Sequence, residues 1–179
     1  TGEATVSPAT LTFTSGNWNS AQTVTVTGIN DDLVDGTQTS TITMSVVDAS
    51  SDNNFDSLND QTVSVTTADT DVAGFTKIES GGSTTVAESG TTDTFTVVLD
   101  AQPASNVVIS VTSGDTGEAT VSTETLQFTS GNWNSAQTVT VTGVNDSLID
   151  GSQNTTITVS VVDSISNDSF DPIWSSQRN

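Results

Sequence analysis

The stretch TGEATVSPATLTFTSGNWNSAQTVTVTGINDDLVDGTQ, residues 1–38, determines the fold, because it occurs twice. It returns as TGEATVSTETLQFTSGNWNSAQTVTVTGVNDSLIDGSQ at residues 116–153, an offset of 115 residues. Similarity continues more weakly, with TITMSVVD at residues 41–48 and TITVSVVD at residues 156–163. A period of this length is too long for a solenoid repeat and suits one antiparallel β-sandwich. We therefore predict tandem β-sandwich repeats of about 115 residues.

The repeat frame divides the chain into two unequal parts. Residues 1–70 are predicted to be the C-terminal part of one sandwich, residues 71–74 a hinge, and residues 75–179 a second sandwich. The strand-like segment QTVSVTT at Gln61–Thr67 has no counterpart one period later, so the second sandwich is expected to lack its last strand. We expect the chain to be a piece of a longer tandem array.

Apolar residues alternate with polar ones in short Thr-rich segments, the pattern of strands buried on one face. Turn-forming Gly, Ser, Asn and Asp residues separate these segments, and none has helical periodicity. We expect an all-β, Ig-like sandwich of about seven strands per unit and no helices. Strands of the second unit are predicted at residues 84–88, 93–99, 106–112, 126–128, 137–142 and 155–162. Leu126 and Phe128 are predicted to form a short strand. The inward-facing residues of the other strands are predicted to be Phe95, Val97, Leu99, Val107, Ile109, Val111, Val139, Val141, Ile157, Val159 and Val161.

The charge and the missing residue types exclude several classes of function. The 22 acidic and 2 basic residues give a net charge of -20, which would repel nucleic acids and anionic membranes. No stretch approaches the roughly 20 apolar residues that a membrane span needs, so we expect no membrane insertion. The chain has no His, Cys or Tyr, which removes Ser–His–Asp and Cys–His catalysis, disulfides and imidazole or thiolate metal sites. We expect the protein not to be an enzyme.

Acidic residues gather at the predicted turns. In the second unit, Asp146 and Asp150 lie in the loop NDSLIDG, and Glu88 and Asp115 lie in two other loops. If the strands run antiparallel, these four side chains can meet at one end of the sandwich. Ca²⁺ takes about six to eight oxygen ligands of this kind, and clustered carboxylates repel one another without a cation. The pattern fits calcium sites or, alternatively, solvated acidic loops on a highly charged surface.

Several motifs carry a resemblance to a known family. They are VAESG at residues 86–90, VVISVTSGDTGEA at residues 107–119 and QTVTVTGVNDSLIDGSQNTTITVSV at residues 137–161. Together they resemble a Calx-beta domain, and more narrowly the Calx-beta-like repeats of giant bacterial surface and adhesion proteins. The resemblance covers essentially the whole chain. It implies an extracellular or cell-surface location and a role in cell adhesion.

The resemblance also implies a set of metal ligands. In the Calx-beta domains of the sodium–calcium exchanger, calcium is held at one end by a Glu after the first strand, an Asp in a middle loop, an acidic loop and a terminal Asp cluster. The corresponding residues here are Glu88, Asp115, Asp146 and Asp150 in the second unit, and Asp31, Asp35, Asp69 and Asp71 in the first. The acidic loop ends in Asp-Gly where the family usually has Glu, and Ser147 replaces Asp32. The first unit is also expected to lack its first strands and the second its terminal Asp pair, so we expect incomplete sites of weak affinity.

Two of the three tryptophans occupy the same repeated segment, SGNWNSAQ. Trp18 and Trp133 are predicted to plug an end of the sandwich core, because a small β unit needs large apolar side chains. The alternative is an exposed Trp that stacks on a sugar ring, as in a carbohydrate-binding module. Trp174, in the divergent tail, fits either role.

Three functions follow from these observations. The favoured one is a structural repeat in an extracellular stalk or filament, stiffened by calcium at loops and repeat junctions. Its partners would be neighbouring repeats or identical chains, and an incomplete sandwich would allow polymerisation by strand exchange. The second is a module that binds a glycan or another cell-surface ligand. The third, a hydrolase built on paired carboxylates, is disfavoured because the sequence shows no pocket and nothing that raises a carboxylate pKa.

Overall fold

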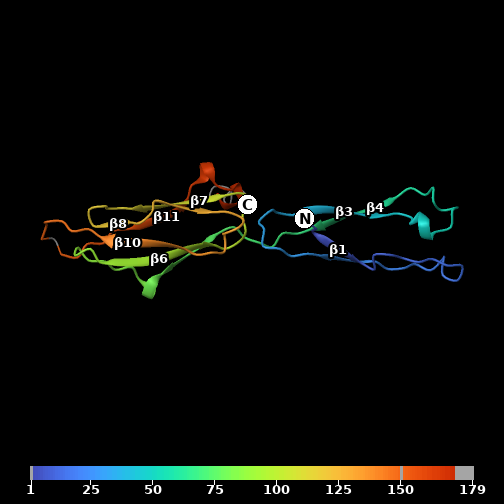
Figure 1. Cartoon of the computed structure of the whole chain (residues 1–179), viewed down its shortest axis with the longest axis horizontal. Helices are drawn as coiled ribbons and strands as arrows, with labels where there is room; N and C mark the ends of the chain where they lie inside the picture. The colour runs from blue at the N-terminus through green and yellow to red at the C-terminus, as the bar shows by residue number, and fades with distance from the viewer. Residues whose placement is uncertain (1, 150, 172–179) are drawn as a thin grey trace. The chain divides into compact units, whose positions relative to one another are not determined.

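The computed structural model describes residues 2–149 and 151–171, which form two compact units (Figure 1). The first contains residues 2–31 and 36–70, and the second contains residues 32–35 and 71–171. All regular elements of the described residues are strands or three-residue 3₁₀ turns, so the prediction of an all-β chain is confirmed. None of the described helices is long and apolar enough to cross a membrane.

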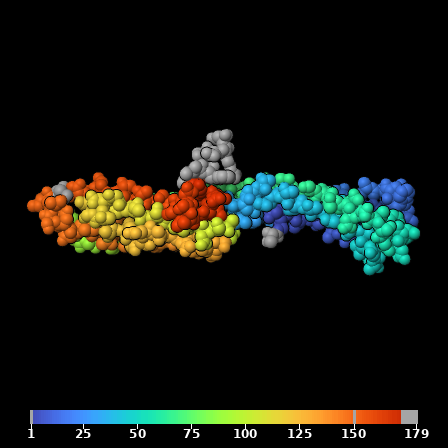
Figure 2. Space-filling view, turned by 90° about the horizontal axis from the view of Figure 1, so that it is seen from above, coloured from blue at the N-terminus to red at the C-terminus, as the bar shows by residue number. Residues whose placement is uncertain are grey.

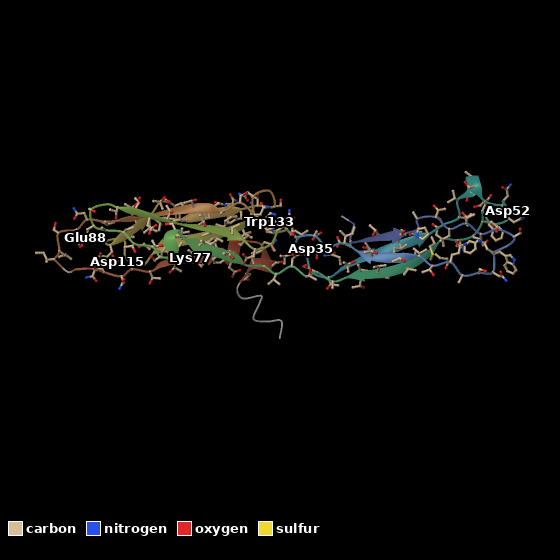
Figure 3. All side chains as sticks on the ribbon, turned by 90° about the horizontal axis from the view of Figure 1, so that it is seen from below. Asp35, Asp52, Lys77, Glu88, Asp115 and Trp133 are labelled. Atoms are coloured by element: carbon tan, nitrogen blue, oxygen red, sulfur yellow. The ribbon has the colours of Figure 1, made fainter. Side chains whose placement is uncertain are left out.

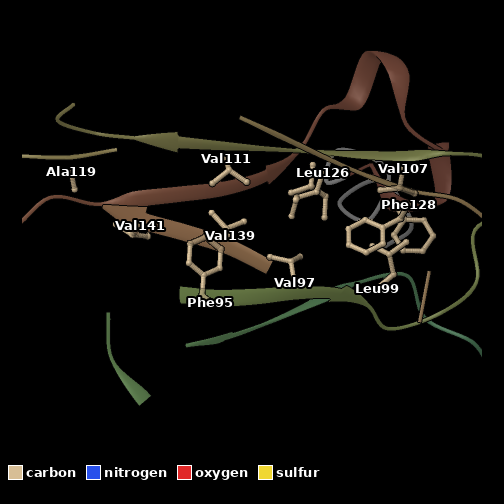
Figure 4. Packing of buried hydrophobic residues seen from close by; sticks show 12 residues of the cluster. Phe95, Val97, Leu99, Val107, Val111, Ala119, Leu126, Phe128, Val139 and Val141 are labelled. Atoms are coloured by element: carbon tan, nitrogen blue, oxygen red, sulfur yellow. The ribbon is translucent and has the colours of Figure 1, made fainter. Parts of the chain in front are cut away.

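The second unit consists of two antiparallel sheets. The larger has the order β5-β6-β10-β8, formed by β5 (Phe75–Glu79), β6 (Thr92–Leu99), β10 (Gln137–Gly143) and β8 (Ala119–Val121). The smaller has the order β11-β7-β9, formed by β11 (Ile157–Val161), β7 (Val107–Ser113) and β9 (Thr125–Phe128). Side chains of β6 and β10 and side chains of β7 and β9 form one hydrophobic core between the sheets (Figure 4). This arrangement is consistent with a β-sandwich.

The predicted inward faces of the second unit are confirmed. Alternate residues of the four central strands are buried: Phe95, Val97, Leu99, Val107, Ile109, Val111, Leu126, Phe128, Val139 and Val141. On β11, which pairs only with β7, Ile157, Val159 and Val161 are half-buried and pack against the same core. Phe170, in the 3₁₀ turn η4 (Asp168–Phe170), adds a further buried ring.

The strand predicted at residues 84–88 is wrong. The backbone N–H of Thr85 donates to Asp93 Oδ2 at 2.8 Å, and that of Ala87 donates to Thr91 Oγ1 at 2.7 Å. Side chains therefore satisfy donors that a strand would offer to a neighbouring backbone, and β5 begins the sheet instead. The segment also passes close to Gly143, where a Cβ atom would lie 2.2 Å from the carbonyl oxygen of Ala87. Only glycine permits this approach.

The first unit has fewer strands and no fully buried residue among those described. It contains two two-stranded antiparallel sheets. One is β1 (Ala4–Ser7) with β2 (Thr25–Gly28), and the other is β3 (Gln38–Met44) with β4 (Gln61–Thr67). The 3₁₀ turn η1 (Asp48–Ser50) follows β3.

Two short segments pack differently from the sequence-based division. Residues 71–74, expected to be a hinge, belong to the second unit, where Ala73 packs against the core and the Gly74 carbonyl accepts a hydrogen bond from Asp100 N at 2.9 Å. Residues 32–35, which belong to the first repeat in sequence, also pack as part of the second unit.

Candidate functional site

The acidic loops of the second unit were the principal candidates for a metal site. Figure 3 shows Glu88 and Asp115 toward the same end of this unit, with Trp133 toward the other. Asp115 Oδ1 accepts a hydrogen bond from Gly117 N at 2.8 Å, and Asp146 Oδ1 accepts one from Leu148 N at 2.8 Å. Each of these two carboxylates therefore stabilises its own turn.

No metal centre is assembled by the part of the chain that the structure describes. Among residues 2–149 and 151–171, no group of three or more acidic side chains is placed to hold a metal ion. The predicted ligand Asp150 lies outside the described residues. Calcium binding by Glu88, Asp115 and Asp146 therefore stays a prediction.

The four candidate ligands of the first repeat are divided between the two units. Asp31 and Asp69 lie in the first unit, whereas Asp35 and Asp71 pack with the second. Asp69 Oδ2 accepts a hydrogen bond from the backbone N–H of Gly36 at 2.8 Å, which connects the end of β4 to the start of β3. This contact gives Asp69 a structural role within the first unit.

One acidic residue that the sequence did not single out has a clear role. Asp93, in β6, accepts hydrogen bonds from the Ser80 hydroxyl, from Thr85 N at 2.8 Å and from Thr94 N at 2.7 Å. The Ser80 hydroxyl, followed by these two amides, holds the pKa of the Asp93 carboxyl below its ordinary value. The residue ties the turn after β5 to β6. An Asp just inside the start of a strand, after a Gly-Ser-rich loop, was the signal available in the sequence.

A second acidic residue, Asp163, has a pKa that is shifted in the opposite direction. The hydrogen bond between the Asp163 and Asp171 side chains raises the pKa of Asp163, and desolvation and the nearby charges of Asp171 and Asp168 raise it further. Asp171 also lines a shallow hollow formed by Ala73, Gly74, Phe75, Val159, Ser160, Val161, Ser169 and Phe170. Sequence reasoning identified neither the Asp163–Asp171 pair nor the hollow, because both depend on tertiary packing. Asp163 is exposed to water, and Asp171 is the one acidic residue among those that line the hollow.

The two repeated tryptophans have different surroundings. Trp133 is half-buried and packs against the core, and its carbonyl accepts a hydrogen bond from Leu99 N at 3.1 Å. The prediction of a core plug is therefore confirmed for Trp133. Trp18 is 70% exposed, so the same prediction is wrong there, because the described residues of its unit form only two two-stranded sheets and do not cover it. Trp174 lies outside the described residues.

No protein-family model, curated protein or solved structure matches the chain. The Calx-beta resemblance therefore rests on the quoted motifs alone. What the geometry adds is a loop that keeps the same internal structure in both repeats. Thr14 Oγ1 donates to Asn17 Oδ1 at 3.0 Å, and Thr129 Oγ1 donates to Asn132 Oδ1 at the same distance.

Further bonds in this loop are also repeated. Gln22 Nε2 donates to the Thr12 carbonyl at 2.9 Å, and Gln137 Nε2 donates to the Gln127 carbonyl at 2.8 Å. The loop is thus a self-contained structural element, held by short-range side-chain bonds. The same side-chain bonds therefore hold this loop in both repeats.

Proposed function

We propose that the chain is a non-enzymatic structural repeat of an extracellular or cell-surface stalk or filament. The observation that carries this proposal is the repetition itself, because a 38-residue stretch returns after one period with the same internal bonds in its SGNWNSAQ loop. A tandem unit of this kind serves as a spacer, since each copy contributes a fixed length. The strongly acidic composition disfavours non-specific aggregation of such a chain.

Scattering from chains of increasing repeat number tests the proposal. Position 179 corresponds to position 64 in the previous period, so appending residues 65–179 continues the repeat in frame. We expect the maximum dimension from small-angle X-ray scattering to increase by a constant step with each appended copy. A matched control carries a Gly-Ser segment of equal length in place of the appended copy. A particle that compacts rather than lengthens would contradict the role of a spacer.

Strand exchange between identical chains is a second part of the proposal. Its support is the open core of the first unit, in which Phe13, Met44 and Val63 are about half-exposed. Strands supplied by another chain would cover this surface and add to the sheets of β1–β2 and β3–β4. Sedimentation velocity over a wide concentration range tests this idea. Concentration-dependent oligomers support it, and a single monomeric species with a cooperative melt contradicts it.

Calcium stiffening is the third part and is tested separately. A ligand that binds only the folded state at 100 times its dissociation constant adds about 2.7 kcal/mol, which shifts the melting temperature by several degrees. We expect millimolar Ca²⁺, but not Mg²⁺, to raise the melting temperature relative to excess chelator. Asp115→Asn and Asp146→Asn should abolish the shift, with Asp52→Asn as the control outside the candidate set. An unchanged melt would leave these residues as turn-stabilising charges.

Binding of a glycan or another cell-surface ligand is the alternative function. The observation that favours it is the exposed indole of Trp18, which presents a flat apolar face to solvent. A glycan array probed with the full chain tests it directly. Binding that is lost in Trp18→Ala and retained in Trp133→Ala would support a sugar platform on the first unit. An array on which the full chain binds nothing would remove the glycan form of this alternative.

A further inference from the structure

One loop of the repeat occurs in two different environments. In the first repeat it is NDDLVDG, residues 30–36, and in the second it is NDSLIDG, residues 145–151. The apolar pair at its centre is Leu33 and Val34 in the first copy and Leu148 and Ile149 in the second. An apolar pair flanked by acidic residues is unusual in a solvated turn, where polar residues dominate.

Residues 32–35, in the first copy of this loop, pack as part of the second unit. Leu33 and Gln102 form a parallel β-bridge, in which Gln102 N donates to the Asp32 carbonyl at 2.7 Å and Val34 N donates to the Gln102 carbonyl at 3.1 Å. Val34 is half-buried and packs against the hydrophobic core, as do Ala73 and Phe75.

The turn that receives the loop is itself firmly held. Ala101 and Pro103, on either side of Gln102, are buried, and the Gln102 side chain donates from Nε2 to the Ser130 carbonyl at 3.1 Å. The adjacent Leu99 N donates to the Trp133 carbonyl at 3.1 Å. The receiving surface is therefore built by the sandwich, and the backbone N–H and carbonyl of Gln102 form the edge at which the loop pairs.

The apolar pair of the second copy is exposed. Leu148 is 66% exposed and Ile149 is completely exposed. Figure 2 shows the orange surface of this part of the chain at the end of the second unit. Leu33 and Val34, one period earlier, are half-buried. The same apolar pair is therefore covered in one copy and open to water in the other.

We propose that residues 145–149 are a docking segment for a further repeat of the same kind. Leu148 would form a β-bridge with the residue corresponding to Gln102, and Ile149 would pack where Val34 packs here. The inference rests on the proposed role as a tandem structural repeat, and it names the partner as the next repeat unit.

The two differences between the loops are compatible with this docking. Asp32 contributes its backbone carbonyl to the bridge and has an exposed side chain, so Ser147 can take its place without loss of a contact. Ile149 differs from Val34 by one methylene group, a small increase at a half-buried position. The leucine is common to both copies.

The absence of cysteine from the sequence allows a direct test by thiol accessibility. We compare Ile149→Cys in the 179-residue chain with the same variant in the chain extended in frame by residues 65–179. We expect the thiol to react rapidly in the shorter chain and about tenfold more slowly, or slower still, in the extended one. Val34→Cys in the shorter chain shows the reactivity of the docked state. Ser147→Cys should react equally fast in both lengths, because its counterpart Asp32 is exposed.

Paired serine substitutions give a second measurement. Leu148→Ser with Ile149→Ser should lower the melting temperature of the extended chain and leave that of the shorter chain unchanged. Leu33→Ser with Val34→Ser should already lower it in the shorter chain. The proposal would be overturned if the Ile149→Cys thiol reacts equally fast in both chain lengths and the Leu148→Ser, Ile149→Ser variant of the extended chain melts at the same temperature as the unsubstituted extended chain.

The outcomes separate this inference from the proposed function. An extended chain that lengthens in scattering while Ile149→Cys stays reactive would retain the stalk role and reject the docking segment. Protection of the thiol in a chain that does not lengthen would retain the docking contact and reject the stalk.

Discussion

Two copies of nearly the same 38-residue sequence adopt different structures within one chain. Phe128 is completely buried in the second copy, whereas its counterpart Phe13 is 53% exposed. Val141 is 2% exposed, and its counterpart Val26 is 40% exposed. The residues are identical in type, so their burial is determined by what lies around them.

The surrounding difference is the segment from β5 to β7. In the second unit β6 pairs with β10 and β7 pairs with β9, and both contribute to the core. The first copy has no equivalent of these strands among the described residues, so the counterpart of β9, residues 10–13, forms no strand. Strand β2 contains only the four residues that pair with β1, whereas its counterpart β10 contains seven residues. Strands therefore depend on partners, whereas the SGNWNSAQ loop does not.

Supplying the missing segment should remove most of the difference. Residues 71–115 immediately precede the second copy, so we place a further copy of them before residue 1. We expect Phe13 and Val26 to become buried, at about 1.5–3 kcal/mol for each apolar side chain, which totals several kcal/mol for the first unit. Peptide-resolved hydrogen exchange should show new protection at residues 10–13 and 22–24. If hydrogen exchange in the first copy stays as fast as before, the added segment does not account for the difference in burial between the two copies.

Truncating one phenylalanine in each copy measures the same contrast in the existing chain. Phe128→Ala should destabilise the second unit by about 3–5 kcal/mol, because it leaves a cavity in a closed core. The matched variant Phe13→Ala should cost no more than about 0.5 kcal/mol, because that ring is half in water. Urea denaturation followed by hydrogen exchange of each unit checks both values. Equal losses in the two variants would mean that the first unit has a core of its own.

The sequence predicted the alternation of buried and exposed residues because that pattern is local. The inward positions of β6, β7 and β10 followed directly from it. The pattern did not show that residues 84–88 form no strand. The side chains of Asp93 and Thr91 accept hydrogen bonds from backbone amides of this segment, and a local pattern does not reveal such contacts. The sequence identified the acidic side chains by residue type. The distances between them depend on loop conformations, which the repeat period does not determine.

Removing the loop's asparagine should affect both copies alike. Asn17 and Asn132 each accept from a threonine hydroxyl and donate from Nδ2 to a carbonyl, that of Thr12 at 3.2 Å and that of Gln127 at 3.3 Å. Asn17→Ala and Asn132→Ala should each cost about 1 kcal/mol of local stability, seen as faster exchange of the loop amides. Asn53→Ala, in another exposed turn, is the control. A loss confined to Asn132→Ala would show that the loop depends on the sandwich after all.

Acidification should affect the contacts of Asp93 in the second unit. The Ser80 hydroxyl and two backbone amides lower the pKa of Asp93, so its ionised form is favoured in the folded state. Its contribution to stability is therefore present above the ordinary Asp pKa and is lost as the pH falls through the lower, folded value. Asp93→Asn should flatten the acid limb of the second unit's stability curve. An identical acid limb in the variant would show that the carboxylate contributes nothing to folding.

The smallest expected effect comes from Asp163 and has the opposite sign. The hydrogen bond with Asp171 raises the pKa of Asp163, so its contribution to stability is present below the ordinary Asp pKa and is lost as the pH rises through the folded value. Asp163→Asn retains a donor to Asp171 without the charge, so it should raise the urea midpoint slightly at pH 7 and leave it unchanged at pH 3. Asp48→Asn, one period earlier, is the matched variant in the first unit. Because both groups are accessible to water, the gain should disappear in high salt, and a gain that persists there would assign it to packing rather than charge.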